Sequence, residues 1–366
     1  MEMSHAFLGI ALMLAPGVGL GSPEAPIAGT PDTTKTIDLL SGALSTTAAE
    51  ELEARLAKAP DDLEARIQLL VYYDKVRHTD ESAESRRIPH VIWVIKNRPE
   101  APIAGLGNYC ALKPDIDGAT VYNAARSSWL GRVGEGQTNT TLIWNAANFF
   151  FGSEETTLIA LCRRGQALEP KNPRWPDKIG FRHELDALFA RDKAQSYTKA
   201  SLALKEYENA LKLTLLKNDQ VWLYDRLAVL YFLIGRDDKA SKYANALLTD
   251  IPVNDMQYGM GVHNGRTILG LIAVKNGDIG KAREHLNESV NITKSSAPPW
   301  PYMDLAKALL EKGQKDAVLE YLELCGKNWE VPGVKDQLAE WADQIRKGMT
   351  PDFFGYLWIN IGNQGK

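Results

Sequence analysis

The sequence predicts an all-α fold in which pairs of helices stack on one another. Residues 221–252 place large and small apolar side chains at helical spacing on both sides of a turn at Gly235. Similar spacing recurs at four other places, and no strand-like alternation longer than a few residues competes with it. One such pair cannot bury its apolar face alone, so the pairs must stack to form a continuous core.

Length and composition are those of an ordinary globular protein. The chain has 366 residues, of which 45% are hydrophobic and 24% are charged, with a formal net charge of −4. The mixed charges show neither the basic surface typical of nucleic-acid binding nor a polybasic membrane patch. The three cysteines, Cys110, Cys162 and Cys325, are far apart, which argues against a disulfide framework or a Cys-x-x-Cys metal site.

The first residues have the outline of a signal peptide. Ala6–Leu14 is a compact apolar run followed by small residues, which predicts a signal peptide over 1–21 and a Pro- and Thr-rich linker over 22–36. The basic start of such a signal is missing, because no Lys or Arg precedes Lys35. The expected location is exported, periplasmic or extracellular, and the alternative is cytoplasmic.

Residues 37–136 predict an irregular helical N-terminal region. Thr46 or Thr47 is the expected N-cap of its first long helix, because hydroxyl side chains accept hydrogen bonds from the first free N–H groups. Helical spacing resumes over 117–133, and Asp117 is the expected N-cap of that helix.

Helix pairs become regular over 137–330. Their first helices are predicted to begin near residues 141, 173, 221, 263 and 299. Residues 331–366 are predicted to form C-terminal capping helices and a tail. The tail contains an apolar segment, Phe353–Gly362, which could cap the array or associate with a second chain.

The clearest pair resembles a tetratricopeptide repeat. The residues that carry the resemblance are Tyr224, Leu227, Ala228 and Tyr231 on the first helix and Ala240, Ala244, Leu247 and Pro252 on and after the second. The resemblance implies a right-handed α-solenoid of tetratricopeptide-like helix pairs with the first helices on a concave face. Other phrases of the chain are similar to those of poorly characterised bacterial proteins with such repeats.

This register places certain side chains on the open face of the first helices. The predicted partner-binding residues are Trp222, Asp225, Asn264, Thr267, Leu271, Trp300, Met303 and Lys307. Trp222 and Trp300 are candidate anchors, because exposed tryptophans are favoured at binding hot spots. The alternative is that both tryptophans fill the seam between successive repeats.

No motif indicates catalysis. His183 and Glu184 begin like a zinc-protease helix, but Ala187 stands where the second histidine is needed. The sequence therefore predicts no catalytic residues, no metal site and no cofactor.

The expected function is that of a non-enzymatic scaffold or adaptor that binds a protein or peptide segment on the concave face. No nucleic-acid partner and no membrane span are expected, and self-association through the C-terminal end is compatible with this function. The alternative is an enzyme or enzyme subunit with a site in the irregular 99–136 region.

Overall fold

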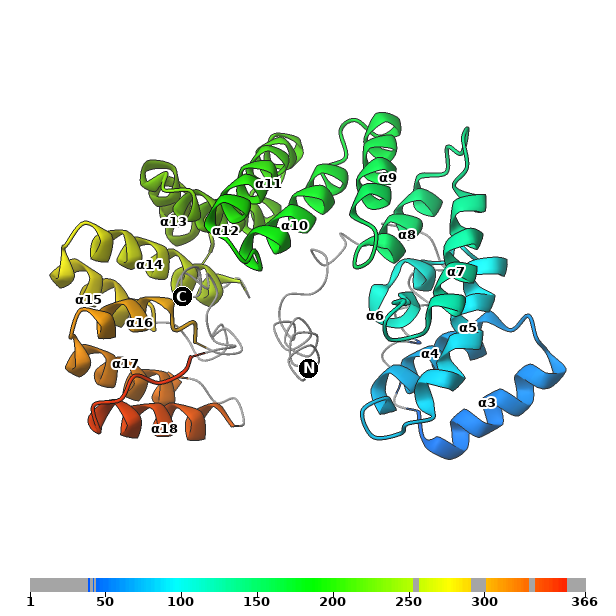
Figure 1. The fold of residues 1–366 in the computed structure, drawn as a ribbon, viewed down its shortest axis with the longest axis horizontal. Coiled ribbons are helices and arrows are strands. Elements are labelled where there is room, and N and C mark those ends of the chain that lie inside the picture. The colour runs from blue at the N-terminus through cyan, green and yellow to red at the C-terminus, as the bar shows by residue number, and fades with distance from the viewer. Residues whose placement is uncertain are drawn as a thin grey trace. The chain divides into compact units, whose positions relative to one another are not determined.

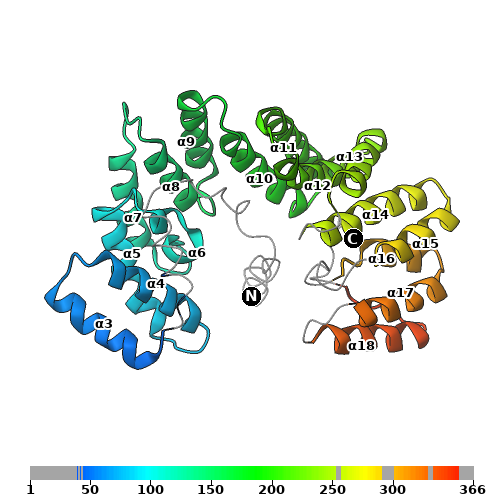
Figure 2. The same ribbon diagram turned by 180° about the vertical axis from the view of Figure 1, so that it is seen from behind.

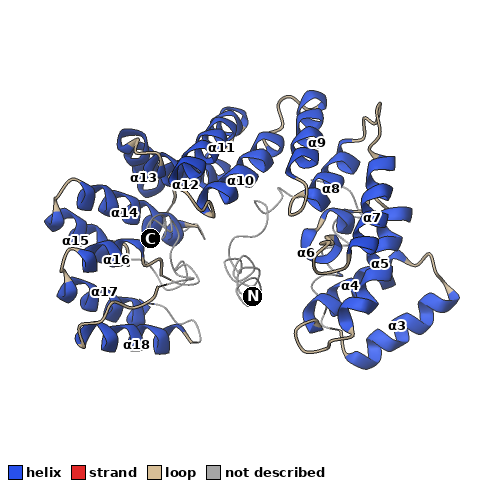
Figure 3. Ribbon diagram, viewed as in Figure 1, coloured by secondary structure: helices blue, strands red, loops and turns tan. Residues whose placement is uncertain are grey.

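The computed structural model describes residues 39, 42, 44–252, 257–290, 301–328 and 333–353. The predicted signal peptide and linker lie outside these residues, as do Trp300 and all of the apolar C-terminal segment except Phe353. Helices and loops make up this part of the chain, without a strand (Figure 3). Within it, no helix is long and apolar enough to cross a membrane.

The chain divides into two compact units between Trp175 and Pro176. The predicted boundaries at 136/137 and 330/331 stay predictions. The helices of the N-terminal unit are α3 (Thr46–Lys58), α4 (Leu63–Val76), α5 (Ala83–Asn97), the 3-10 helix η1 (Pro102–Gly105), α6 (Gly107–Cys110), α7 (Ala119–Arg132), α8 (Thr140–Phe150) and α9 (Glu155–Leu168). α10 (Arg174–Leu188) begins at the boundary and continues into the C-terminal unit.

Helix α3 begins at Thr46, one or two residues earlier than the predicted N-caps imply. Ser45 is its N-cap, and the Ser45 hydroxyl accepts a hydrogen bond from the Ala48 N–H at 3.2 Å. The expectation that Thr46 or Thr47 caps this helix was therefore wrong. Three consecutive hydroxyl residues offer the same capping chemistry, and packing selects among them. Leu52 and Leu56 of α3 are buried against α4.

The N-cap of α7 was also assigned wrongly. Gly118 occupies that position with a φ of 92°, a conformation that favours glycine. The Asp117 carboxylate instead accepts a hydrogen bond from the Lys113 N–H at 2.6 Å, within the loop that precedes the helix.

The C-terminal unit is a stack of helix pairs (Figures 1 and 2). After α10 its helices are α11 (Lys193–Leu213), α12 (Lys217–Leu233), α13 (Asp237–Thr249), α14 (Tyr258–Lys275), α15 (Ile279–Glu288), α16 (Asp304–Glu311), α17 (Lys315–Asn328) and α18 (Val334–Arg346). The first helices of three successive pairs form one layer, in which α12 contacts α14 and α14 contacts α16. Helices α15 and α17 of the second layer are likewise in contact.

Three successive pairs share one turn. Gly235, Gly277 and Gly313 each follow a first helix with φ between 75° and 80°. In the first turn the Arg236 N–H reaches back to the Tyr231 carbonyl at 2.8 Å, and the other two turns repeat this hydrogen bond at 2.9 Å. This is the Schellman motif, which satisfies carbonyls at the helix end and reverses the chain.

Small residues allow the helices of the C-terminal unit to approach closely. Ala228 and Ala240 are fully buried, as the repeat pattern predicts. On α14 a Cβ atom at Gly265 would lie only 2.7 Å from the Ala244 carbonyl oxygen of α13, so a larger residue does not fit there. The predicted all-α stack of helix pairs is confirmed for the described residues.

Candidate functional site

The structure places the predicted face residues in three different environments. Four of them are buried: Asn264, Thr267, Leu271 and Met303. Trp222, Asp225 and Lys307 are half-buried. Buried residues cannot contact a partner across an open face, so the expectation of an exposed row along the first helices needs correction for those four. Asn264, Thr267 and Leu271 are buried because α14 packs on α12, α13, α15 and α16. Met303 is the N-cap of α16, which packs on α14, α15 and α17.

Trp222, Asp225 and Asn264 line one cavity, at the seam where α14 packs on α12 and α13. The other lining residues are Val221, Leu247, Gln257, Met260 and Gly261. Including its mouth, the cavity has about 230 Å³ of open space. About 10 Å³ of this can hold the centre of a water-sized group. The cavity thus combines mainly apolar walls with one carboxyl and one buried amide.

In the walls of this cavity one hydrogen-bond acceptor and one donor have no partner among the described residues. The Asn264 amide donates to the Asp225 carboxyl at 2.9 Å. Burial raises the pKa of Asp225 to about 7, although the Asn264 hydrogen bond and the charge of Arg226 act in the opposite direction. Asn264 is 1% exposed, and its side-chain oxygen has no hydrogen-bond partner among the described residues. The indole N–H of Trp222 is likewise buried and unpartnered there.

Arg226, the neighbour of Asp225, binds Glu184 and Tyr207 rather than Asp225. Its guanidinium lies 2.5 Å from the Glu184 carboxylate and donates to the Tyr207 hydroxyl at 2.6 Å. The guanidinium also lies 4.5 Å from the centre of the Phe181 ring. The negative charge of Glu184 adds to the rise in the pKa of Asp225. This network was not predicted from the sequence, because its members lie on three different helices, α10, α11 and α12.

Thr267 and His263, both on α14, make hydrogen bonds that hold this helix in place. The Thr267 hydroxyl donates to the His263 carbonyl at 2.8 Å. The His263 ring donates from Nδ1 to the Ser289 carbonyl at 3.2 Å and accepts from the Tyr302 N–H at 2.9 Å. Burial lowers the pKa of His263 to about 4. These contacts require the neutral ring, so His263 ties α14 to the end of α15 and to the residues before α16.

In the N-terminal unit, Arg87 of α5 binds residues of the 99–136 region. The Arg87 guanidinium donates to the Glu84 carboxylate at 2.5 Å and to the Tyr109 carbonyl at 2.6 Å. It also lies 3.4 Å from the Asp117 carboxylate. Burial is the main cause that raises the pKa of Asp117 to about 6. The charged groups of this cluster therefore hold a loop in place.

A second polar cluster joins the first three helices of the same unit. The Glu53 carboxylate accepts hydrogen bonds from the Tyr73 hydroxyl at 2.5 Å and from the His90 Nε2 at 3.1 Å. Arg66 donates to the other ring nitrogen of His90 at 3.0 Å and lies 4.3 Å from the centre of the Trp93 ring. Both nitrogens of His90 are thus engaged in holding α3, α4 and α5 together.

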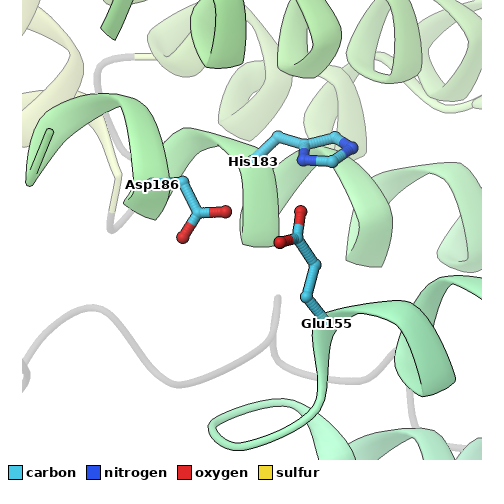
Figure 4. A group of neighbouring side chains, drawn as sticks. All are labelled: Glu155, His183 and Asp186. Carbon is cyan, nitrogen blue, oxygen red and sulfur yellow. The ribbon is translucent and has the colours of Figure 1, made fainter. Parts of the chain in front are cut away.

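Figure 4 shows Glu155, His183 and Asp186. Glu155 belongs to α9 in the N-terminal unit, whereas the other two residues lie on α10 in the C-terminal unit, so they do not define a site within either unit. His183 is buried. The Asp186 carboxylate is paired within its own unit, with Arg182 at 2.6 Å and Lys199 at 3.0 Å.

Comparisons with known proteins found a similarity among solved structures. No family model matches the sequence, and no curated protein matches it. Among solved structures, the chain is similar to human IFIT1, in a structure described as the IFIT1 dimer with PPP-AAAA. The TM-score is 0.46 and the sequence identity is 16%, over 82% of this chain and 68% of that chain.

The predicted exclusion of nucleic acid needs correction. It relied on the absence of a basic surface, yet the similar chain in the IFIT1 structure was solved with PPP-AAAA. The sequence analysis expected a protein or peptide partner and no nucleic acid. The exclusion of nucleic acid was wrong. Net charge describes the whole chain and does not describe the local surface that a ligand meets.

Proposed function

We propose that this chain is a non-enzymatic scaffold whose C-terminal helix pairs bind a segment of a partner molecule. The observation that carries the proposal is the convergence of Trp222, Asp225 and Asn264 on one cavity. These residues come from the first helices of two successive pairs, where repeat proteins present their binding surfaces.

The chemistry of the cavity favours a peptide segment as the ligand. Apolar walls and a half-buried tryptophan supply contact area, and Asp225 and Asn264 supply hydrogen-bond acceptors. A phosphate would lie beside the Asp225 carboxyl without a free cation to balance it, because Arg226 is engaged with Glu184. We therefore expect a peptide to bind and include RNA as the alternative ligand in the test.

The proposal is tested by selecting peptides that bind the immobilised full-length chain and measuring the affinity of the best one by fluorescence anisotropy. We expect micromolar affinity and at least a tenfold loss in Trp222→Ala, because this change removes the largest side chain at the cavity. Trp93→Ala is the matched control, since Trp93 is half-buried in the N-terminal unit and should leave affinity unchanged. An RNA carrying a 5′-triphosphate is measured in parallel.

Two results would contradict the proposal. The first is RNA binding by a chain that selects no peptide. The second is peptide binding that Trp222→Ala leaves unaltered. A lower melting temperature in Trp222→Ala, with peptide affinity unchanged, would assign this tryptophan to the seam between repeats.

A further inference from the structure

We propose that the cavity beside Asp225 is a binding subsite for a primary ammonium group on an aliphatic stem. This inference rests on the proposed function and deepens it, because it names the chemical group that a partner would insert between α12 and α14. The same chemistry is offered by a lysine side chain and by the free amino terminus of a chain.

Unused hydrogen-bond acceptors are the first support for this proposal. The Asn264 side-chain oxygen is buried and has no partner among the described residues, and Asn264 is one of the residues that line the cavity. The Asp225 carboxyl receives one hydrogen bond, from Asn264, on one of its oxygens. A buried acceptor without a donor is costly, so a ligand that donates hydrogen bonds gains affinity at this place. An ammonium group carries three donors.

The balance of charge also favours a cation. Three carboxyl groups, those of Asp177, Glu184 and Asp225, face two cations, because Arg226 acts on all three and Lys178 acts on Asp177. Arg226 is bonded to Glu184 and Tyr207, which leaves Asp225 without an ion-pair partner of its own. A ligand cation would supply that partner in surroundings where water screens the interaction poorly.

The size of the cavity favours one kind of cation. Its interior has room for about one water-sized group, which suits a compact ammonium head better than a planar guanidinium with its three nitrogens. Val221, Leu247 and Met260 form apolar walls that would cover a short alkyl stem. Narrow apolar walls with a carboxyl among them are the arrangement expected for a lysine-like group.

Protonation of Asp225 supplies a second readout. Because burial raises its pKa to about 7, roughly half of these carboxyls carry a proton at neutral pH. An ammonium ion binds the ionised form, so its binding must release that proton. The ionised fraction rises about tenfold between pH 6 and pH 8, and the affinity for the cation should rise by the same factor.

The test uses the full-length chain and n-butylammonium as the probe, with affinity measured by calorimetry at pH 6 and pH 8. We expect about tenfold tighter binding at pH 8, no measurable binding of n-butanol and loss of binding in Asp225→Asn. Asp219→Asn is the matched control, because Asp219 is exposed on the same helix and lies outside the cavity. If Asp225→Asn fails to fold, the pH dependence of amine binding and the comparison with n-butanol still test the proposal.

Two short peptides then identify the source of the ammonium. One carries a lysine and a blocked amino terminus, and the other carries a free amino terminus and no lysine. The proposal is overturned if n-butylammonium does not bind, if Asp225→Asn binds it as tightly as the native chain, or if the cavity takes up only an ordered water molecule. Peptide selection can succeed while the amine fails, and the reverse can occur, so this inference and the proposed function can fail separately.

Discussion

Two polar clusters of the N-terminal unit, around Arg87 and His90, differ from the seam beside Asp225 in the C-terminal unit. In the N-terminal unit, both nitrogens of His90 have partners, and Arg87 joins two carboxylates and two backbone carbonyls. In the C-terminal unit, Asp225 and Asn264 keep acceptor capacity beside a cavity. The N-terminal clusters complete their hydrogen bonds internally, whereas the C-terminal seam leaves some for a ligand. Polar groups buried in a fold thus indicate a binding site only where their hydrogen bonds are incomplete.

Removing the arginine of the N-terminal cluster should give the largest loss of stability. Arg87→Met leaves the Asp117 carboxylate buried without its cation, and we expect a loss of about 3 kcal/mol at pH 8. The loss should be smaller at pH 5, because Asp117, with a pKa near 6, then takes up a proton. Urea melts at both pH values measure this effect.

The control for that prediction is a double variant. Arg87→Met combined with Asp117→Asn removes the unpaired charge and should recover part of the lost stability. Affinity for n-butylammonium should be the same in the native chain and in both variants. A change in that affinity would show that the N-terminal cluster affects ligand binding, and it would contradict the difference between the two units.

Acid should weaken the C-terminal unit through His263. Its pKa is about 4 in the folded chain and near 6.5 in an unfolded one, so the unfolded state binds the proton more tightly. The stabilisation is therefore complete above pH 6.5 and is lost as pH falls from 6.5 to 4, by at most about 3 kcal/mol. Thermal melts across this range test it, with His263→Gln as the comparison. An equally steep acid loss in that variant would contradict this assignment.

A large residue at a fully buried position of α13 should disturb the stack. Ala240 is fully buried on α13, so Ala240→Trp should cost about 1–3 kcal/mol through overpacking and lower the helical signal. Asn245→Trp is the matched control, because Asn245 is exposed on the same helix. Equal melting temperatures for the two variants would refute the assigned register of the repeat.

The turn glycines should give the smallest measurable loss. Gly277 has a φ of 80°, a conformation that costs a residue with a Cβ atom about 1 kcal/mol, so Gly277→Ala should lower stability by that amount. At Gly280, in the first turn of α15, a Cβ atom would meet only the Asp278 carboxylate at 3.7 Å. Gly280→Ala should therefore cause no loss, and an equal loss in both variants would argue against the shared turn.

The sequence predicted the repeats well because their signals are local. The small residues Ala228 and Ala240 and the turn at Gly235 lie within one pair of helices, and helical periodicity exposes them directly. The predicted open face was less accurate. Asn264 and Leu271 have the right spacing for that face, but the packing of α14 on four other helices buries them.

The polar partnerships could not be predicted, because they join distant residues. Asp225 and Asn264 are 39 positions apart, and Arg87 and Asp117 are 30 positions apart. A shift of one residue in the packing of two helices would separate either pair, and no periodicity encodes that register. Asp117 shows the same limit, since its sequence context fits an N-cap whereas its carboxylate faces Arg87 and the Lys113 N–H.

The ionisation of Asp225 tests the central claim most directly. Carbon-13 NMR of the aspartate side chains, with Asp225→Asn to assign the signal, would follow this carboxyl through a pH titration. We predict a pKa near 7 for Asp225 in the free chain and a fall of at least one pH unit with saturating n-butylammonium. An ordinary pKa near 4 for Asp225, or a pKa that the amine leaves unchanged, would contradict the account. It would show that the polar groups of the C-terminal seam complete their hydrogen bonds internally, as those of the N-terminal clusters do.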